Sequence, residues 1–201
     1  RVLPNVIGID IGCGMTLAKV KGKTKEFQKL DVVIRENVPS GFSIRKNMHH
    51  MANTIDLTML CCYKHIFEEK ALLSLGTLGG GNHFIEIDVD ENGTKYLIIH
   101  SGSRNLGLQV AKFYQNLAVE LNHGKEEYFK LRDEIISNYK AQGRKSEIQP
   151  ALIKLSQEWE EKEPTLPADL CYLYDTFMED YLHDVKICQE FASRNREKMA
   201  E

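Results

Sequence analysis

The sequence lacks any long apolar run: runs such as residues 96–99 fall far short of the ~20 residues that cross a bilayer. It also lacks a basic start followed by an apolar stretch, so we expect no signal peptide, no membrane partner and a cytoplasmic location. Its five cysteines are an odd number without the spacing of a disulfide framework, which favours free thiols in a reducing compartment. With 42% apolar and 27% charged residues, the 201-residue chain is typical of a folded protein.

A strong charge of one sign is also missing, since the net charge is only −3. The charge is unevenly distributed, however. Residues 1–50 carry nine basic and four acidic side chains, and residues 151–201 carry six basic and twelve acidic ones. The first quarter could therefore face a polyanion, although ordinary solvated surface explains the same distribution.

The first half of the chain predicts short strands separated by glycine clusters. Residues 6–11 and 16–20 predict strands joined across Gly12, Cys13 and Gly14. Residues 85–90 alternate apolar and acidic side chains, and the Asn92-Gly93 pair predicts a hairpin back into residues 95–100. We therefore expect an α+β fold with a mixed sheet, in which this hairpin carries the functional site.

The second half predicts helices. One apolar stripe follows Asn105 and consists of Leu106, Val110, Phe113, Leu117 and Leu121. Another lies near the end of the chain and consists of Leu170, Tyr174, Phe177, Tyr181, Val185, Cys188 and Phe191. Between them, residues 125–140 and 147–163 predict a charged helical hairpin with breaks near Gly143 and Pro150, and Pro164 and Pro167 predict the next turn. We expect a single domain, sheet-rich over residues 1–105 and helical over 106–201. Because the chain begins with arginine rather than methionine, we expect its true N-terminus to be missing, and we expect the domain to be incomplete at its other end as well.

The hairpin indicates a metal site. If Asn92 and Gly93 form a two-residue loop, Ile85 faces His100, and His83 is the diagonal neighbour of His100 on the same face. Two imidazoles at that separation could bind one metal. The alternative is a chance pairing of two histidines on a half-buried sheet face.

A second cluster of donors lies near the N-terminus. Asp10 ends an apolar stretch, and Cys13 stands between two glycines that allow a close approach of the backbone. A carboxylate and a thiolate three residues apart could bind one cation, and a thiolate can bridge two. Together with the histidines they form a mixed S/N/O set that suits borderline divalent metals. Alternatively, Cys13 is a small buried apolar residue in a tight turn.

Two segments indicate phosphate binding. Gly79, Gly80, Gly81 and Asn82 form a run whose backbone N–H groups could face an anion, unless it is a plain loop. The segment from Ser101 through Ser103 to Arg104 leads into the helix near Asn105, where hydroxyl, guanidinium and helix N-terminus could bind an anion. Simple capping of that helix by Ser103 or Asn105 explains the same residues.

Three motifs together resemble the RtcB family of RNA ligases. They are GIDIGCGM at residues 8–15, GTLGGGNHFIE at 76–86 and HSGSRNLG at 100–107. Their order and spacing agree with the family, and the similarity extends more loosely through residues 181–196. It covers most of this chain but about half of a typical member.

The resemblance implies a GTP- and manganese-dependent ligase with two Mn²⁺ ions per active site. Such enzymes join RNA ending in a 3′-phosphate or 2′,3′-cyclic phosphate to RNA bearing a 5′-hydroxyl, through a guanylylated histidine, and a helper protein can assist them. By the motifs, Asp10, Cys13 and His83 bind one ion, and Cys13 bridges to another bound by His100. The guanylate contacts are implied to be Asn82, His83, Phe84, Ile85 and Glu86.

The motif of the guanylylated histidine is missing from residues 1–201, so the resemblance implies that it lies beyond Glu201 and that this chain alone is inactive. His123 and His183 stand in charged helical segments, and His49, His50 and His65 match no motif, so we expect all five to be structural or on the surface. Two alternatives stay open. The same metals could activate water in a binuclear phosphoesterase, or the chain could be a non-catalytic remnant that binds metal or RNA.

Overall fold

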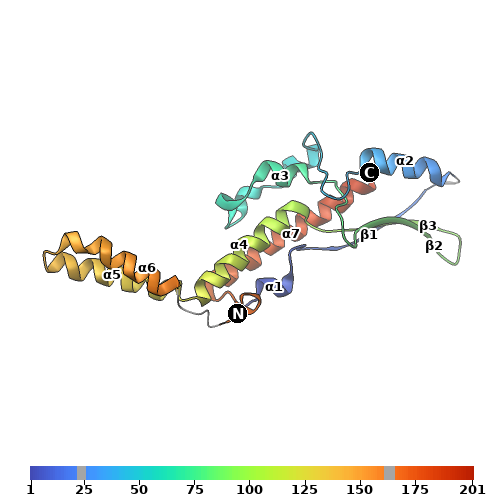
Figure 1. Cartoon of the computed structure of the whole chain (residues 1–201). Coiled ribbons are helices and arrows are strands. Elements are labelled where there is room, and N and C mark those ends of the chain that lie inside the picture. Colours follow the sequence, from blue (N-terminus) through green and yellow to red (C-terminus); the bar gives the residue numbers. More distant parts are fainter. Residues whose placement is uncertain (22–25, 161–165) are drawn as a thin grey trace. The chain divides into compact units, whose positions relative to one another are not determined.

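The computed structural model describes residues 1–21, 26–160 and 166–201. The chain divides into two compact units, each taken here by itself (Figure 1). The sheet unit comprises Ile7–Phe113 and Asp175–Glu201, and the helical unit comprises Arg1–Val6 and Tyr114–Tyr174. The last helix of the chain thus belongs with the sheet. A single domain, incomplete at both ends, stays a prediction.

The sheet unit is built on three strands, β1 (Gly14–Lys19), β2 (Phe84–Val89) and β3 (Lys95–Ser101), in the order β1-β3-β2. Both pairings are antiparallel, whereas a mixed sheet was predicted; the α+β class and the helical second half are confirmed. Met15 and Phe84 are both register partners of His100, so the three residues share one face. On that face Met15 and Leu17 are each 63% exposed.

The opposite face of the sheet packs against α7 (Asp175–Ala200). Thr16 and Ser101 lie on this face and meet Arg196 of α7. Ile99 of β3 is fully buried there. The helix therefore covers one face of the sheet, and the opposite face is the one that carries His100.

The predicted strand over residues 6–11 is wrong. Val6 and Ile7 end a short helix, α1 (Pro4–Ile7), and a turn follows. Gly8 and Gly12 have φ values of +84° and +78°. Residues of a regular strand have negative φ values, so neither glycine belongs to one. The predicted strand over 16–20 is confirmed as β1, which begins two residues earlier.

The hairpin is confirmed, but its predicted register is wrong by one residue. Phe84, not Ile85, faces His100, because the loop has three residues, 91–93, rather than two. The Asp90 carboxylate accepts the N–H groups of Asn92 and Thr94, and Gly93 has a φ of +78°. This is the three-residue hairpin loop with a left-handed last residue.

The sheet unit also contains short helices on the chain between β1 and β2. They are α2 (Phe27–Asn37), η1 (His50–Thr54), η2 (Leu57–Met59), η3 (Tyr63–His65) and α3 (Glu68–Leu73). The long helix α4 (Arg104–Asn122) begins in the sheet unit and ends in the helical unit. In the described part of the chain, no helix combines the length and apolarity that crossing a membrane requires.

The helical unit consists mainly of the end of α4 and a hairpin of α5 (Lys125–Ala141) and α6 (Ile148–Glu160), with the short turns η4 (Lys145–Glu147) and η5 (Ala168–Leu170). The predicted hairpin is confirmed, and Gly143 breaks it with a φ of +71°. Pro150 falls within the first turn of α6, where its missing N–H costs no hydrogen bond. Residues 161–163, the predicted end of α6, and Pro164 lie outside the described residues.

The predicted apolar stripes are largely confirmed. Leu106, Val110 and Leu121 of α4 are buried, and so are Tyr181, Val185, Cys188 and Phe191 of α7. The stripe predicted for the last helix begins too early in the sequence. Helix α7 starts at Asp175, and Leu170 lies before it in η5, where it is 54% exposed.

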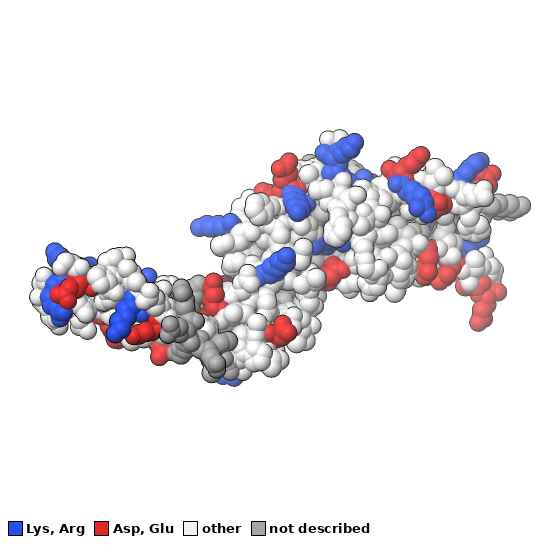
Figure 2. Space-filling model, in the orientation of Figure 1, with Lys and Arg blue, Asp and Glu red and all other residues white. Residues whose placement is uncertain are grey.

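Charged side chains of both signs are mixed on the face drawn in Figure 2. In the helical hairpin, for example, Arg144 pairs with Glu147 and Lys154 pairs with Glu158. Neither basic nor acidic side chains form a broad continuous patch on that face.

Candidate metal centre

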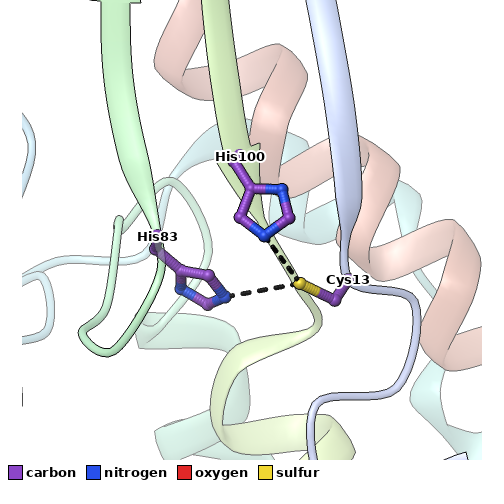
Figure 3. A group of neighbouring side chains, drawn as sticks. All are labelled: Cys13, His83 and His100. Atoms are coloured by element: carbon purple, nitrogen blue, oxygen red, sulfur yellow. Dashed lines mark hydrogen bonds between the residues drawn. The ribbon is translucent and has the colours of Figure 1, made fainter.

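Three side chains from separate segments meet at one end of the sheet (Figure 3). Cys13 directly precedes β1, His83 directly precedes β2, and His100 is the penultimate residue of β3. Cys13 Sγ lies 3.3 Å from His100 Nε2 and 3.7 Å from His83 Nε2. The three potential ligand atoms all lie within 4.8 Å of one another. One ion, or two ions sharing the thiolate, could be bound by atoms at this spacing.

Asp10 is a fourth potential ligand. Its Oδ2 lies 2.6 Å from His83 Nε2, and its side chain is 34% exposed. Asp10 and Cys13 are joined by a β-turn in which the Cys13 N–H donates to the Asp10 carbonyl at 3.1 Å. Gly12 supplies the positive φ of +78° that the third position of such a turn requires. The turn therefore presents the carboxylate and the thiol together.

His83 is oriented by a backbone carbonyl. Its Nδ1 lies 2.8 Å from the Leu78 carbonyl oxygen, which can only accept a hydrogen bond. Nδ1 therefore carries a proton, and Nε2 is directed at Asp10 and Cys13. Metal-binding histidines are commonly held in this way, with the outer nitrogen bonded to a carbonyl and the inner one left for the metal.

His83 and His100 come together although the predicted register is wrong. In the observed register His83 lies beyond the end of β2, so the strict alternation of faces does not extend to it. Its ring lies 5.6 Å from that of His100, centroid to centroid, and the Phe84 ring stacks on the His100 ring at 5.4 Å. His100 Nδ1 is buried without a hydrogen-bond partner among the described residues.

Arg196 of α7 connects the two strands that carry Cys13 and His100. Its guanidinium donates to the Gly12 carbonyl at 3.1 Å and to the Ser101 carbonyl at 2.9 Å. Each carbonyl belongs to a residue adjacent to one of the two ligands. Burial lowers the pKa of Arg196, and the neighbouring Cys13 opposes that shift. We therefore assign Arg196 a positioning role, which sequence analysis missed.

Asn195, the preceding residue, connects two loops of the site. Its Oδ1 accepts the N–H groups of Gly76 and Thr77, at 2.7 and 3.1 Å. Its Nδ2 donates to the Thr77 and Gly102 carbonyls and to the Ser101 hydroxyl. Asn195 is fully buried. The one signal for it in the sequence is a polar side chain that follows the apolar stripe of α7.

The donor set fits a borderline divalent metal. A thiol, two imidazole nitrogens and a carboxylate converge, and such mixed sets bind ions of the manganese-to-zinc series rather than calcium. Burial and the adjacent Asp10 carboxylate raise the pKa of the Cys13 thiol, while Arg196 and the Gly14 N–H oppose this. A cation at this point would offset the cost of bringing a thiolate and a carboxylate together.

The residues expected to bind a nucleotide are divided between two faces. Phe84 lies on the face of His100, and Glu86 follows it there, exposed. Asn82 is exposed in the turn before β2. Ile85 lies on the opposite face. Of this group, His83 belongs to the candidate metal centre itself, and Phe84 and Glu86 lie on the face of the sheet that carries His100.

Ser101 and Ser103, two of the residues expected to bind phosphate, are buried. The Ser101 hydroxyl donates to the Leu78 carbonyl at 2.9 Å, and Ser103 Oγ is buried without a hydrogen-bond partner among the described residues. Ser103 thus gives α4 no side-chain cap in the described structure. Arg104, with a φ of +55°, packs its guanidinium against Gly79 and donates to Thr77 Oγ1 at 3.2 Å. Anion binding by these residues stays a prediction.

Gly102 provides the space that Asp10 occupies. A Cβ at position 102 would overlap the Asp10 carboxylate. We therefore expect Gly102→Ala to displace this carboxylate and to weaken metal binding by about 10- to 100-fold, the range for a disturbed metal site. Titration calorimetry with Mn²⁺ measures the change. Ile153→Ala on α6, at a position that is 52% exposed in the helical unit, is the control; equal affinity in both variants would show that Asp10 is not a ligand.

Comparison with known proteins gives matches over the whole chain. RNA-splicing ligase RtcB of Escherichia coli K12 is 26% identical over 223 residues, covering 100% of this chain and 46% of that protein. RNA-splicing ligase RtcB1 of E. coli ATCC 25922 is 28% identical, with the same coverage. The tRNA-splicing ligase RtcB of Methanococcus maripaludis is 28% identical over 60% of this chain and 36% of its own length. The chain spans about half the length of the E. coli relatives.

The family model described as tRNA-splicing ligase RtcB matches residues 59–201. The matched segment contains β2, β3, α4 and α7, and therefore both histidines of the candidate metal centre. A match over more than half of the sequence establishes that the chain belongs to the RtcB family.

Proposed function

We propose that this chain is the metal- and nucleotide-binding part of an RNA ligase. The reaction joins an RNA end carrying a 3′-phosphate or 2′,3′-cyclic phosphate to one carrying a 5′-hydroxyl. The convergence of Cys13, His83 and His100 beside Asp10 is the observation that supports this proposal. The names of the relatives, which are RNA-splicing and tRNA-splicing ligases, agree with it.

The centre is proposed to bind two Mn²⁺ ions. Asp10, Cys13 and His83 would bind one ion, and Cys13 with His100 would bind the other. The near-equal distances from Cys13 Sγ to the two Nε2 atoms, 3.3 and 3.7 Å, support a shared thiolate. Bound manganese would supply positive charge for phosphate oxygens. The protein's own part is to fix these donors, through the Leu78 carbonyl at His83 and through Arg196 at the strand ends.

GTP is the proposed nucleotide, bound along residues 82–86. Phe84 is stacked on His100, and Glu86 lies exposed further along the same face. A carboxylate there would accept hydrogen bonds from the N–H groups of guanine, which adenine does not offer in the same arrangement. The histidine that receives GMP is proposed to come from residues outside this sequence. Neither of the later histidines is proposed for this role. His123 directly follows α4, and the His183 ring is hydrogen-bonded to the Met59 carbonyl.

A ligation assay on the full-length protein tests the proposal. With Mn²⁺ and GTP, we expect joining of RNA with a 3′-phosphate to RNA with a 5′-hydroxyl, and no joining with ATP. His83→Ala should reduce the rate at least about 100-fold, because it removes a donor and a nucleotide contact together. His123→Ala, in the helical unit, is the matched control. Release of phosphate without joining, and without a need for GTP, would instead support a phosphoesterase.

A further inference from the structure

A second group of ligand-type side chains lies elsewhere in the sheet unit. Cys61, between η2 and η3, meets His183 and Asp184 of α7, and their ligand atoms lie within 4.8 Å of one another. The members come from segments 122 residues apart or more in the sequence. None of them belongs to the centre at Cys13 or to a motif that sequence analysis identified.

Asp184 is held in place by the loop that it faces. Its Oδ1 accepts the N–H of Cys61 at 2.8 Å, and its Oδ2 accepts the N–H of Cys62 at 3.1 Å. The carboxylate is fully buried. These two hydrogen bonds from the loop backbone fix the orientation of the carboxylate.

His183 is oriented in the way that His83 is. Its Nε2 lies 3.1 Å from the Met59 carbonyl oxygen, which can only accept, so this nitrogen carries the proton and Nδ1 keeps its lone pair. A backbone carbonyl on the outer nitrogen is the usual companion of a metal-binding histidine. His183 is exposed, so an ion can reach the group from solvent.

Asp180 is an acidic neighbour of this group. It precedes Asp184 by one helical turn on α7, and the side chains of both residues interact with the Cys61 thiol. The members that the geometry brings together remain Cys61, His183 and Asp184.

We propose that Cys61, His183 and Asp184 form a second metal centre for one zinc-type divalent ion. Thiolate and imidazole donors favour zinc over magnesium or calcium. Three protein donors would leave the fourth position of a tetrahedral ion to water, which reaches the group at the exposed His183. The ion would fasten the segment between η2 and η3 to α7.

Cobalt(II) provides the test, because its bond to a thiolate absorbs in the near ultraviolet. The metal-free protein carrying Cys13→Ser and His100→Ala, which removes two donors of the first centre, should bind one Co²⁺ per chain and show this band. Adding Cys61→Ser or His183→Ala should abolish the band and lower the affinity at least about tenfold. Adding Cys171→Ala, in the helical unit, should change neither.

A second measurement uses otherwise unaltered protein. Excess Zn²⁺ should raise the Tm of the wild type more than that of His183→Ala, an exposed position where the substitution disturbs little packing. A cobalt band that is absent when Cys61 is intact, or that survives Cys61→Ser, would overturn the second centre. Equal zinc-induced shifts in Tm for wild type and His183→Ala would do the same.

Discussion

Replacing Cys13 with serine should abolish high-affinity manganese binding at the centre. The thiol lies between both imidazoles, 3.3 Å from His100 Nε2 and 3.7 Å from His83 Nε2, so its loss affects every ion that the centre holds. A serine hydroxyl stays protonated at neutral pH and is a poor substitute for a thiolate. We expect the affinity to fall by at least about 100-fold, at the upper end of what a changed metal site loses.

Metal analysis after equilibrium dialysis against limiting Mn²⁺ measures this loss. Cys171→Ala is the matched control, because Cys171 is buried in the helical unit and should leave the manganese content unchanged. The role assigned to Cys13 fails if the serine variant and the control retain the same amount of manganese.

Replacing Asn195 with leucine should cause a large loss of stability. The substitution leaves the N–H groups of Gly76 and Thr77 and the Gly102 carbonyl without their present partner. Each buried group left unsatisfied costs about 1–3 kcal/mol. We expect the free energy of unfolding to fall by about 3–5 kcal/mol, because disruption of a buried hydrogen-bond network is one of the few mechanisms that cause losses of this size.

Urea unfolding followed by circular dichroism measures the difference. Asn37→Leu is the control: Asn37 is exposed at the end of α2, and its side chain bonds only to the carbonyl of its own helix at Val33 in the described structure. Such a surface change should stay within about 0.5 kcal/mol of the wild type. If the two variants lose similar stability, Asn195 does not have the role described.

Local patterns in the sequence predicted the three strands and the helices α4 to α7, but not α2, α3 or the short turns between them. The alternation over β2, the Asn92-Gly93 turn and the stripes of α4 and α7 all depend on neighbouring residues, and periodicity captures them. The register failed because Asn92-Gly93 also fits a three-residue loop, and Asp90 selects it by accepting two backbone N–H groups. The strand at residues 6–11 failed because an apolar run does not reveal the left-handed backbone at Gly8 and Gly12.

The candidate site was predicted in part. Motifs and strand geometry placed Asp10, Cys13, His83 and His100 together, and the structure brings them together. Their supporting residues could not be predicted, because Asn195 and Arg196 act through tertiary contacts with segments that are remote in the sequence. A polar residue beside an apolar stripe indicates that a polar side chain is buried, but it does not indicate which loop that side chain bonds to.

The contacts of α7 have a consequence for the order of assembly during synthesis. Arg196 bonds to Gly12 across 184 positions of the chain, and Asn195 bonds to Gly76 across 119. A ribosome releases Cys13 and both histidines before it has made α7, and contacts this distant in sequence slow folding. The hydrogen bonds that Arg196 and Asn195 make to the segments around these three residues therefore form only after α7 has emerged. At the proposed centre, capture of a metal by fixed donors would then be a late event, after translation of the segment that ends at Ala200.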